Sequence, residues 1–291
     1  MNVQGRDCAF TLILGSRLMS LPYSTETLRE APRLITREAL LDGTRGDAIP
    51  GSVETAGCVV TSLSISTAPY LLALALGAEE DPEWVSETRS LYRHRLTQRY
   101  GRDGARCAVI QDRVFRVRYF LGLRRAGYQL RGAAGDRLYL RLDLQSEAGS
   151  EDADYYLAAR PPAEEAFRFD QGTLIVNGQA VPGFYAFSLT VNAEGSGAGA
   201  ELRLHSTLNA QAAALLDKPR IDQVDLRFTL VNSFYEDRRP GYFRISARDL
   251  LLQADESAVD AADEVIGSRR YIVNGDLADE VYTADGERLL P

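Results

Sequence analysis

VVTSLSIS (59–66) alternates apolar and polar residues, and the apolar segment APYLLALAL (68–76) follows it almost at once. Alternation with a period of two predicts a strand with one buried face, whereas a short Ala- and Leu-rich segment predicts a helix of two or three turns. Thr67 suits the N-cap, Pro69 is tolerated in the first turn, and Gly77 is a natural stop. This stretch therefore predicts a strand that leads directly into a short helix.

The same unit occurs again about 140 residues later. AELRLH (200–205) alternates, and NAQAAALL (209–216) follows and is terminated by Lys218-Pro219. A strand-helix unit in each half, with further strands after it, predicts two related β-rich domains at 1–150 and 165–291, joined by a polar, Pro-containing linker. Duplicated β-domains of this size are more often building blocks than enzymes.

Segments bounded by turn residues predict the remaining strands. In the first half they are 9–14, 34–41, 53–66, 90–98, 107–123 with a break near Asp112, and 127–145. In the second half they are 173–176, 184–191, 200–205, 224–231, 242–247 and 250–254, with two short edge strands at 269–273 and 280–283. Asn177-Gly178 predicts a hairpin turn, and the turn-rich stretch 41–51 predicts an exposed loop. The predicted class is mainly β: two tandem β-sandwich or barrel-like domains, each with one short flanking α-helix.

Composition narrows the class of function. The 291 residues are 45% apolar, which is ordinary for a globular chain. The net charge of −8 argues against a sequence-independent nucleic-acid binder, which needs a basic surface. Basic charge is almost entirely arginine, and Lys218 is the only lysine. A GC-rich genome explains this bias, and many bidentate interface pairs are the alternative.

Cysteine usage and hydropathy point to a soluble protein made in a reducing compartment. Cys8, Cys58 and Cys107 are widely spaced and form no CxxC pair, so neither a zinc site nor a redox pair is indicated. The N-terminus carries no secretory leader pattern, and the longest apolar run, 70–76, is far shorter than the roughly 20 residues of a membrane span.

A search for catalytic or ligand-binding chemistry assigns no catalytic, cofactor-binding or metal-ligating residue. His94 and His205 lie in predicted strands and are interpreted as surface or hydrogen-bonded strand histidines. There is no Gly-x-Ser-x-Gly elbow, and Gly195–Gly199 precedes a strand, so it predicts a hairpin loop and not a phosphate-binding loop. The acidic stretch 255–264 lacks the spacing of a calcium loop and predicts a solvated loop or an acidic contact surface.

A series of arginines complements that acidic stretch. These arginines are either the solvent face of strands or a surface for an acidic neighbour. Because the two segments have opposite charge and lie in different halves, a head-to-tail contact between copies is one hypothesis. The series comprises Arg113, Arg116, Arg118, Arg124, Arg125, Arg131, Arg137 and Arg141.

Several of these segments, taken in order, resemble a known family. The first half contains LPYSTETLR (21–29), DGTRG (42–46), IPG (49–51), VETAG (53–57) and LLALALG (71–77). The second half contains LIVNG (174–178), FSLTV (187–191) and FRIS (243–246). This order of apolar, glycine and turn patterns resembles phage tail tube proteins of the two-domain type.

The resemblance implies a structural virion protein that is not an enzyme and needs no cofactor. Such a subunit assembles into rings that stack into a tube around a DNA-conducting channel. Its implied partners are further copies of itself, within a ring and between rings, and the tape measure and tail terminator proteins. DNA is met only in transit, and no membrane is involved. The implied location is the virion tail, after synthesis and assembly in the bacterial host cytoplasm.

The residues agree with this reading in three respects. Two strand-helix units in one chain suit a ring in which three two-domain copies mimic six one-domain copies, although trimeric and hexameric rings both stay open. Net negative charge suits a lumen through which DNA slides, because a basic wall would bind phosphate. Long amphipathic strands need edge partners, which ring closure supplies, and the exposed loop 41–51 is expected to contact the next ring.

Other readings remain. A distal tail or baseplate hub protein uses related β-domains. A carbohydrate-binding β-sandwich or adhesin needs exposed aromatics, yet Trp84 is the only tryptophan and lies in a predicted acidic connector. Tyr155-Tyr156, or Phe234, Tyr235 and Tyr242, would have to form the sugar platform. A β-rich hydrolase with two carboxylates finds no selective pair among the many Asp and Glu residues.

Overall fold

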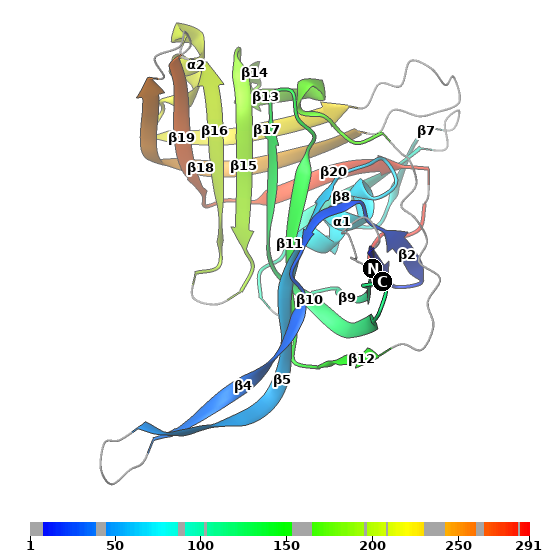
Figure 1. Cartoon of the computed structure of the whole chain (residues 1–291). Helices are drawn as coiled ribbons and strands as arrows, with labels where there is room; N and C mark the ends of the chain where they lie inside the picture. Colours follow the sequence, from blue (N-terminus) through cyan, green and yellow to red (C-terminus); the bar gives the residue numbers. More distant parts are fainter. Residues whose placement is uncertain are drawn as a thin grey trace.

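The structure, a computed structural model, describes residues 8–38, 45–86, 91–101, 104–152, 165–194, 197–207, 209–229, 242–259, 265–284 and 286–291. Within these residues the chain is mainly β with two short α-helices, as the sequence predicts. Long antiparallel strands form the body, and the hairpin of β4 and β5 projects from it (Figure 1).

The first half of the chain runs from β1 to β12. Its elements are β1 (Ala9–Leu14), β2 (Arg17–Ser20), β3 (Tyr23–Glu26), β4 (Arg29–Glu38), β5 (Arg45–Ser62), α1 (Ala68–Leu76), β6 (Gly77–Glu79), β7 (Glu83–Ser86), β8 (Leu91–Gln98), β9 (Arg106–Asp112), β10 (Val117–Ala133), β11 (Tyr139–Ser146) and β12 (Ser150–Asp152).

The second half runs from β13 to β20. Its elements are a 3₁₀ turn (Phe169–Gln171), β13 (Gly172–Val176), β14 (Gln179–Ala180), β15 (Phe184–Asn192), β16 (Gly199–Thr207), α2 (Ala210–Leu216), β17 (Arg220–Thr229), β18 (Tyr242–Val259), β19 (Val265–Val273) and β20 (Leu277–Thr283).

Both predicted helices are confirmed, because each has the end signals that its sequence announces. Gly77 ends α1 in the left-handed region, with φ of 88°, a conformation that glycine adopts without steric cost. Asn209 caps α2, and its side chain accepts a hydrogen bond of 2.8 Å from the N–H of Ala212. Thr67 occupies the N-cap position of α1 but does not cap it with its side chain, which instead accepts a hydrogen bond from the N–H of Ser64.

Two predicted boundaries in the first half are wrong. Residues 45–51 belong to β5 and not to a loop, because their pairing with β4 outweighs the turn preference of Gly and Pro; residues 41–44 lie outside the described residues. The predicted strand 127–145 is interrupted by a turn at Gly135, whose φ is 79°. The strand β10 instead starts at Val117 and continues through Gly122, where a φ of 61° bends the chain without ending the ladder.

Three predictions in other parts of the chain are also corrected. Residues 242–247 and 250–254 form one strand, β18, which continues to Val259, so that 255–259 is strand and not loop; 260–264 lies outside the described residues. The predicted edge strands are interior, because β19 pairs with both β16 and β18, and β20 pairs with both β18 and β8. Trp84 lies in the short strand β7 and not in a connector.

The two halves share one plan of strand pairing. In the first half β1 pairs with β2 and β9, β9 with β10, β10 with β11 and β12, and β11 with β5. In the second half β13 pairs with β14 and β17, β17 with β18, β18 with β19 and β20, and β19 with β16. The helices α1 and α2 follow β5 and β16, which are equivalent strands. The chain is therefore an internal repeat of two β units, and β6 to β8 are an addition to the first.

The repeat extends to single residues. Gly127 follows a bulge in the ladder of β10 and β11, and Ala254 follows a bulge in the ladder of β18 and β19, 127 positions later. Gly122 and Asp249, also 127 positions apart, both have positive φ, of 61° and 52°. A shared bulge and a shared bend fix the register of the two units against each other.

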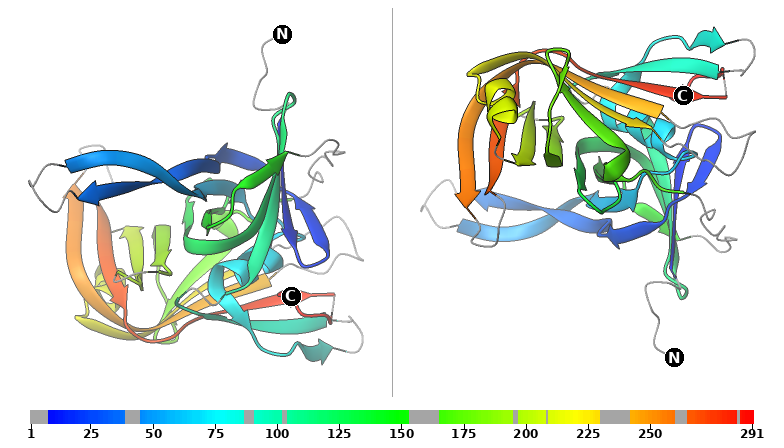
Figure 2. Two further views of the ribbon diagram at one scale, coloured as in Figure 1. Left: turned by 90° about the horizontal axis from the view of Figure 1, so that it is seen from below. Right: turned by 90° about the horizontal axis from the view of Figure 1, so that it is seen from above.

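Each unit buries its apolar side chains between facing layers of strands. In the second unit Leu189 and Leu202 of one layer face Leu226 and Ile245 of the other. The rings of Phe187 and Phe228 lie 5.6 Å apart across the same core. The helix α1 is buried along almost its whole length, against β8, β10 and β20 (Figure 2).

Two ladders join the units into one hydrogen-bonded structure. Gly127–Ala133 of β10 pairs with Ala186–Asn192 of β15, and β8 pairs with β20. The strand β10 therefore has two partners along one edge: β9 up to Arg124, and β15 from Gly127 onward. The β10–β15 ladder places the hairpin of the second unit against the sheet of the first.

Candidate functional site

The sheet that spans both units has one apolar and one polar face. Leu130 of β10 and Leu189 of β15 are buried on the apolar face. On the polar face, Gln129 Nε2 donates hydrogen bonds across the junction to Ser188 Oγ (3.0 Å) and Thr190 Oγ1 (3.3 Å). This face forms an open groove of about 800 Å³ over the β10–β15 junction. Its charged lining residues are Arg131, Asp136, Arg137, Glu201 and Arg203, together with His205.

Three arginines of the polar face are paired with carboxylates. Arg141 lies 2.9 Å from Asp143 on β11. Glu201 contacts both Arg203 (2.7 Å) and Arg270 (2.6 Å). Burial raises the pKa of Glu201, but hydrogen bonds from the two arginines outweigh burial, so that its pKa lies below the ordinary value. The face therefore carries both signs of charge in close pairs.

Most of the arginines singled out in the sequence are paired within the chain. Arg125 is buried and donates to the carbonyls of Ala75 and Arg99, near the C-terminal end of α1. Four others contact carboxylates: Arg113 with Glu26 (3.0 Å), Arg116 with Asp152 (2.8 Å), Arg118 with Glu30 (3.8 Å) and Arg124 with Glu194 (3.0 Å). Because these arginines already have partners within the chain, the series is poorly described as one basic patch for an acidic neighbour.

Two long strand edges have no ladder partner among the described residues. One is the edge of β18 that faces away from β19, from Ala254 to Val259; β17 pairs along this edge only as far as Leu251. The other is the edge of β3 and β4 that faces away from β5. An unpaired edge presents a row of N–H and C=O groups and is a template for another strand.

The hairpin of β4 and β5 extends beyond its counterpart in the second unit. The β15–β16 ladder ends at Asn192 and Gly199. The β4–β5 ladder passes Ala31 and Glu54 and continues to Glu38 and Arg45. We call the part beyond Ala31 and Glu54 the arm. The arm projects from the body at the lower left of Figure 1.

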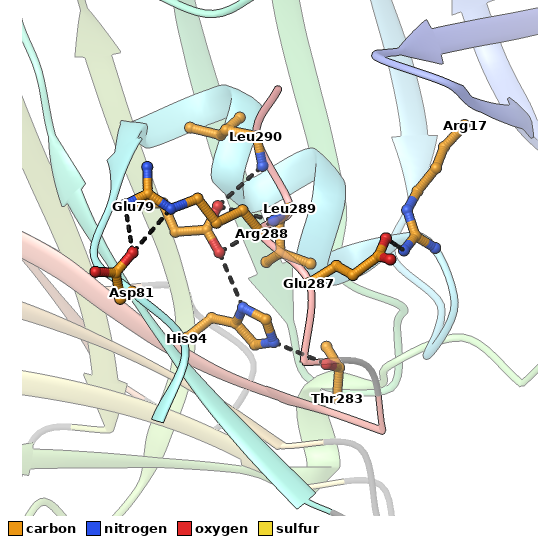
Figure 3. A network of polar contacts seen from close by, with 9 residues as sticks. All are labelled: Arg17, Glu79, Asp81, His94, Thr283, Glu287, Arg288, Leu289 and Leu290. Carbon is orange, nitrogen blue, oxygen red and sulfur yellow. Dashed lines mark hydrogen bonds and ion pairs between the residues drawn. The ribbon is translucent and has the colours of Figure 1, made fainter. Parts of the chain in front are cut away.

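A buried polar network fastens the C-terminal segment to the first unit (Figure 3). His94 on β8 is fully buried, and its Nδ1 lies 2.9 Å from Glu79 Oε1 while its Nε2 lies 2.8 Å from Thr283 Oγ1. The Glu79 carboxylate also accepts hydrogen bonds from the N–H groups of Leu289 (2.8 and 3.0 Å) and Leu290 (2.9 Å). Residues far apart in sequence are thus held by one carboxylate.

Hydrogen bonding decides the charge of Glu79. Burial raises its pKa, but the hydrogen bonds from His94, Leu290 and Leu289 outweigh burial, so that its pKa lies below the ordinary value. Around this centre Arg288 pairs with Asp81, and Arg17 with Glu287 (3.6 Å). The arrangement positions a chain segment.

A second buried ion group holds α2. The guanidinium of Arg269 is almost fully buried, with Nε and Nη2 both 2.8 Å from Asp217 Oδ1 and Nη1 3.0 Å from Ser206 Oγ. Asp217 is the C-cap residue of α2, directly after Leu216, and Asp255 on β18 lies 4.0 Å from the same guanidinium. Arg269 therefore links the helix to β18.

The sequence analysis assigns no role to Glu79, Arg269 or Asp279. For two of them the sequence carries a signal, because each is a charged residue on the buried face of an alternating strand. Arg269 shares that face with Tyr271 and Val273, and Asp279 shares it with Leu277 and Val281. A charged residue at a core position of an alternating strand marks a buried polar contact. For Glu79 no such signal exists, because its partners come from distant elements.

The other candidates give no reactive site. His205 lines the polar groove, Gly199 begins β16, and residues 195–196 lie outside the described residues. Among the described residues, no three His, Cys, Asp or Glu side chains gather to hold a metal ion. Burial raises the pKa of the free thiol of Cys107 to about 12. Of the aromatic candidates, Tyr242 stacks edge-on with Tyr282, and the remaining ones fall outside the described residues. No α-helix in the described ranges has the length and apolarity of a membrane span.

The buried carboxyl group of Asp279 is expected to contribute less to stability as the pH rises. Burial raises its pKa well above the ordinary value, and neither oxygen of its carboxyl group has a hydrogen-bond partner among the described residues. The folded state therefore binds this proton more tightly than the unfolded state, and the contribution of Asp279 falls as the pH rises through and above its unfolded pKa of about 3.9. We expect Asp279→Asn to stabilise the protein by roughly 1–3 kcal/mol at pH 8 and by less at pH 4, measured by urea unfolding. An equal effect at both pH values would show that folding does not raise the pKa of this carboxyl group.

Neither a scan against protein-family models nor a search of curated proteins finds a match to this chain.

Proposed function

We propose that this chain is a non-enzymatic structural subunit that assembles with itself into rings, which stack into the tail tube of a phage or prophage-like particle. The proposal combines the likeness of the sequence to two-domain tail tube proteins with the geometry of the strand edges. A distal tail or baseplate hub protein is the nearest alternative within the same class. A carbohydrate-binding β-sandwich or adhesin is the alternative from another class, and the exposed aromatic residues in the described part of the chain include Trp84, Tyr100, Phe115 and Tyr185.

The β10–β15 ladder is the observation that carries the proposal. One β unit accepts the hairpin of the next unit along the edge of its long strand. The equivalent edge of the second unit, on β18, has no partner among the described residues. The β18 edge could therefore accept the hairpin of a second copy, as the β10 edge accepts the hairpin of the second unit. Repeated head-to-tail contacts of this kind generate a closed ring when the rotation between copies divides a full turn.

The polar face of the spanning sheet is the surface we assign to the channel. It lies opposite the buried apolar face, and three of its arginines, Arg141, Arg203 and Arg270, are paired with Asp143 or Glu201. Each such pair reduces the basic charge that could hold phosphate, which suits a wall past which DNA slides. The tape measure and tail terminator proteins are the further partners, and the virion tail, assembled in a bacterial host, is the location.

Light scattering and negative-stain electron microscopy of the purified protein at rising concentration test the proposal. We expect ring-shaped particles, and stacks of rings at the highest concentrations. A protein that stays monomeric at every concentration, alone and with its tail partners, would contradict the proposal.

Shortening the arm separates stacking from ring formation. Replacement of residues 33–52 by a two-residue turn ends the hairpin where its counterpart in the second unit ends. We expect rings to persist and stacked tubes to disappear, because the arm is the element that reaches beyond the body. Electron microscopy measures both, and an unchanged melting temperature serves as the control for folding. Tubes of normal length from the shortened protein would show that the arm is not the inter-ring contact.

A further inference from the structure

The equivalent of β15 in the first unit is found from a shared bulge. The ladder of β15 with β16 has a bulge between Phe184 and Ala186. The ladder of β3 with β5 has a bulge between Tyr23 and Thr25, opposite the equivalent residues of β5. Counted from these bulges, Thr25 corresponds to Ala186, 161 positions later.

The same spacing continues along β4. Ala31 pairs with Glu54 as Asn192 pairs with Gly199, again 161 positions later. Leu28 and Leu189, which correspond, are both buried, with 2% and 1% of their surface exposed. The edge formed by β3 and the start of β4 is therefore the first unit's version of the edge that β15 presents to β10.

We propose that the open edge of β18 pairs, antiparallel, with the β3–β4 edge of a second copy of this chain, in the register of the β10–β15 ladder. This inference rests on the proposed function, because it names the contact that joins copies within a ring. The opposed residues would be Ala254 with Ala31, Asp255 with Glu30, Glu256 with Arg29, Ser257 with Leu28, Ala258 with Thr27, and Val259 with Glu26.

The backbone groups of the two edges match. In the inner ladder the N–H of Ala193 bonds to the carbonyl of Ala126 (2.9 Å), and the N–H of Ala134 to the carbonyl of Tyr185 (2.9 Å). Bonded positions alternate along an antiparallel ladder, so every second residue of β10 between these points faces β15. The equivalent outward-facing residues of β18 are Asp255, Ser257 and Val259. Those of the receiving edge are Glu26, Leu28 and Glu30.

The receiving edge is capped by side chains in the isolated chain. Glu26 Oε1 accepts the N–H of Leu28 (2.5 Å), and Gln111 Nε2 donates to the carbonyl of Leu28 (3.3 Å). The amide and the carbonyl of Leu28 are the groups that the proposed ladder would use. In the isolated chain the partners of these groups are side chains. A strand of a second copy can replace each of these hydrogen bonds with one of its own.

Charge on the polar face also fits. Gln129 and Thr190 oppose each other in the inner ladder and are hydrogen-bonded at 3.3 Å. Their counterparts in the proposed ladder, Glu256 and Arg29, are residues of opposite charge, a combination that favours cross-strand pairing.

The opposite face brings two acidic residues together. Asp255 opposes Glu30, which by itself would disfavour pairing. Each already has an arginine of its own chain within reach: Arg269 lies 4.0 Å from Asp255, and Arg118 lies 3.8 Å from Glu30. The two arginines would flank the two carboxylates and balance their charge.

Cysteine cross-linking between separately labelled copies tests the register. Ala31→Cys and Ala254→Cys are made in separate chains that also carry Cys8→Ser, since Cys58 and Cys107 are buried. The two variants are mixed, assembled and oxidised. We expect a disulfide-linked dimer from the mixture only, because directly opposed positions bring Cβ atoms within bonding reach. Thr25→Cys mixed with Ala254→Cys is the out-of-register control, about 20 Å away along the strand.

Light scattering on the same samples separates the two levels of the proposal. Assembled particles that give no Ala31–Ala254 cross-link, or that cross-link equally through position 25, would overturn this register and leave self-assembly standing. Particles that never assemble would overturn both.

Ser257→Pro provides a second test that does not depend on oxidation. Proline removes the outward N–H at position 257 and leaves the β18–β19 ladder its own donors. We expect the concentration needed for assembly to rise at least about 30-fold, with an unchanged circular dichroism spectrum. Ser257→Ala, which keeps the N–H, should assemble normally. Normal assembly of the proline variant would contradict the proposed ladder.

Discussion

Glu79→Ala is expected to lower the free energy of unfolding by about 3–5 kcal/mol. The carboxylate, 2% exposed, accepts hydrogen bonds from His94 and from the N–H groups of Leu289 and Leu290. Its removal leaves these donors buried without an acceptor and releases the C-terminal segment from β6 and β8. Urea unfolding measures the loss, and hydrogen exchange should show faster exchange at Leu289 and Leu290 than in the core.

The pH dependence of the same variant has a defined sign. Because the pKa of Glu79 lies below its ordinary value in the folded state, its contribution is fully present above its unfolded pKa of about 4.3 and is lost as the pH falls through the folded pKa. The difference between wild type and Glu79→Ala should therefore be constant from pH 6 to 8 and shrink below pH 4. Glu79→Gln, which keeps one acceptor, is the matched control and should cost less. A loss below 1 kcal/mol for Glu79→Ala would show that water replaces the carboxylate.

Arg269→Ala is expected to cost about 3 kcal/mol of stability. The side chain is 1% exposed and bonds to both Asp217 and Ser206, so its truncation opens a cavity and frees the end of α2. Its partner Asp217 is 40% exposed and can be hydrated, which keeps the cost below that of stranding a buried charge. Assembly should weaken as well, because Arg269 faces Asp255 at the open edge of β18.

Arg203→Ala is the matched control for Arg269. Arg203 lies on β16, one strand away, and is paired with Glu201 at the surface. Exposed pairs contribute little, so a loss below about 1 kcal/mol is expected. Equal losses from the two variants, measured by urea unfolding, would contradict the assignment of Arg269 as the anchor of α2.

Local signals in the sequence were sufficient for the helices and most strands. The Leu-rich run that stops at Gly77 predicts α1, and Asn209 with Lys218-Pro219 predicts α2, because capping and termination act within one turn. The break near Asp112 is also correct, since β9 ends there. Predictions failed where cross-strand pairing competes with local preference: β5 runs through Pro50-Gly51, and β18 bends at Asp249 without ending.

The repeat itself was predicted from the strand-helix pattern, but its register was not visible. Equivalent positions hold unlike residues, such as Gly122 and Asp249, which share only a positive φ. The β10–β15 and β8–β20 ladders join residues distant in sequence, and the open edges follow from those ladders alone. The assignments of the chain to two separable domains and to the tail tube family stay predictions.

Electron cryomicroscopy of the assembled protein tests whether copies are joined through β18. We expect closed rings in which strand density continues from β18 of one copy into β3 and β4 of the next, with the polar face of the spanning sheet toward the channel. Discrete particles in which both edges face solvent, or copies joined through other surfaces, would contradict it.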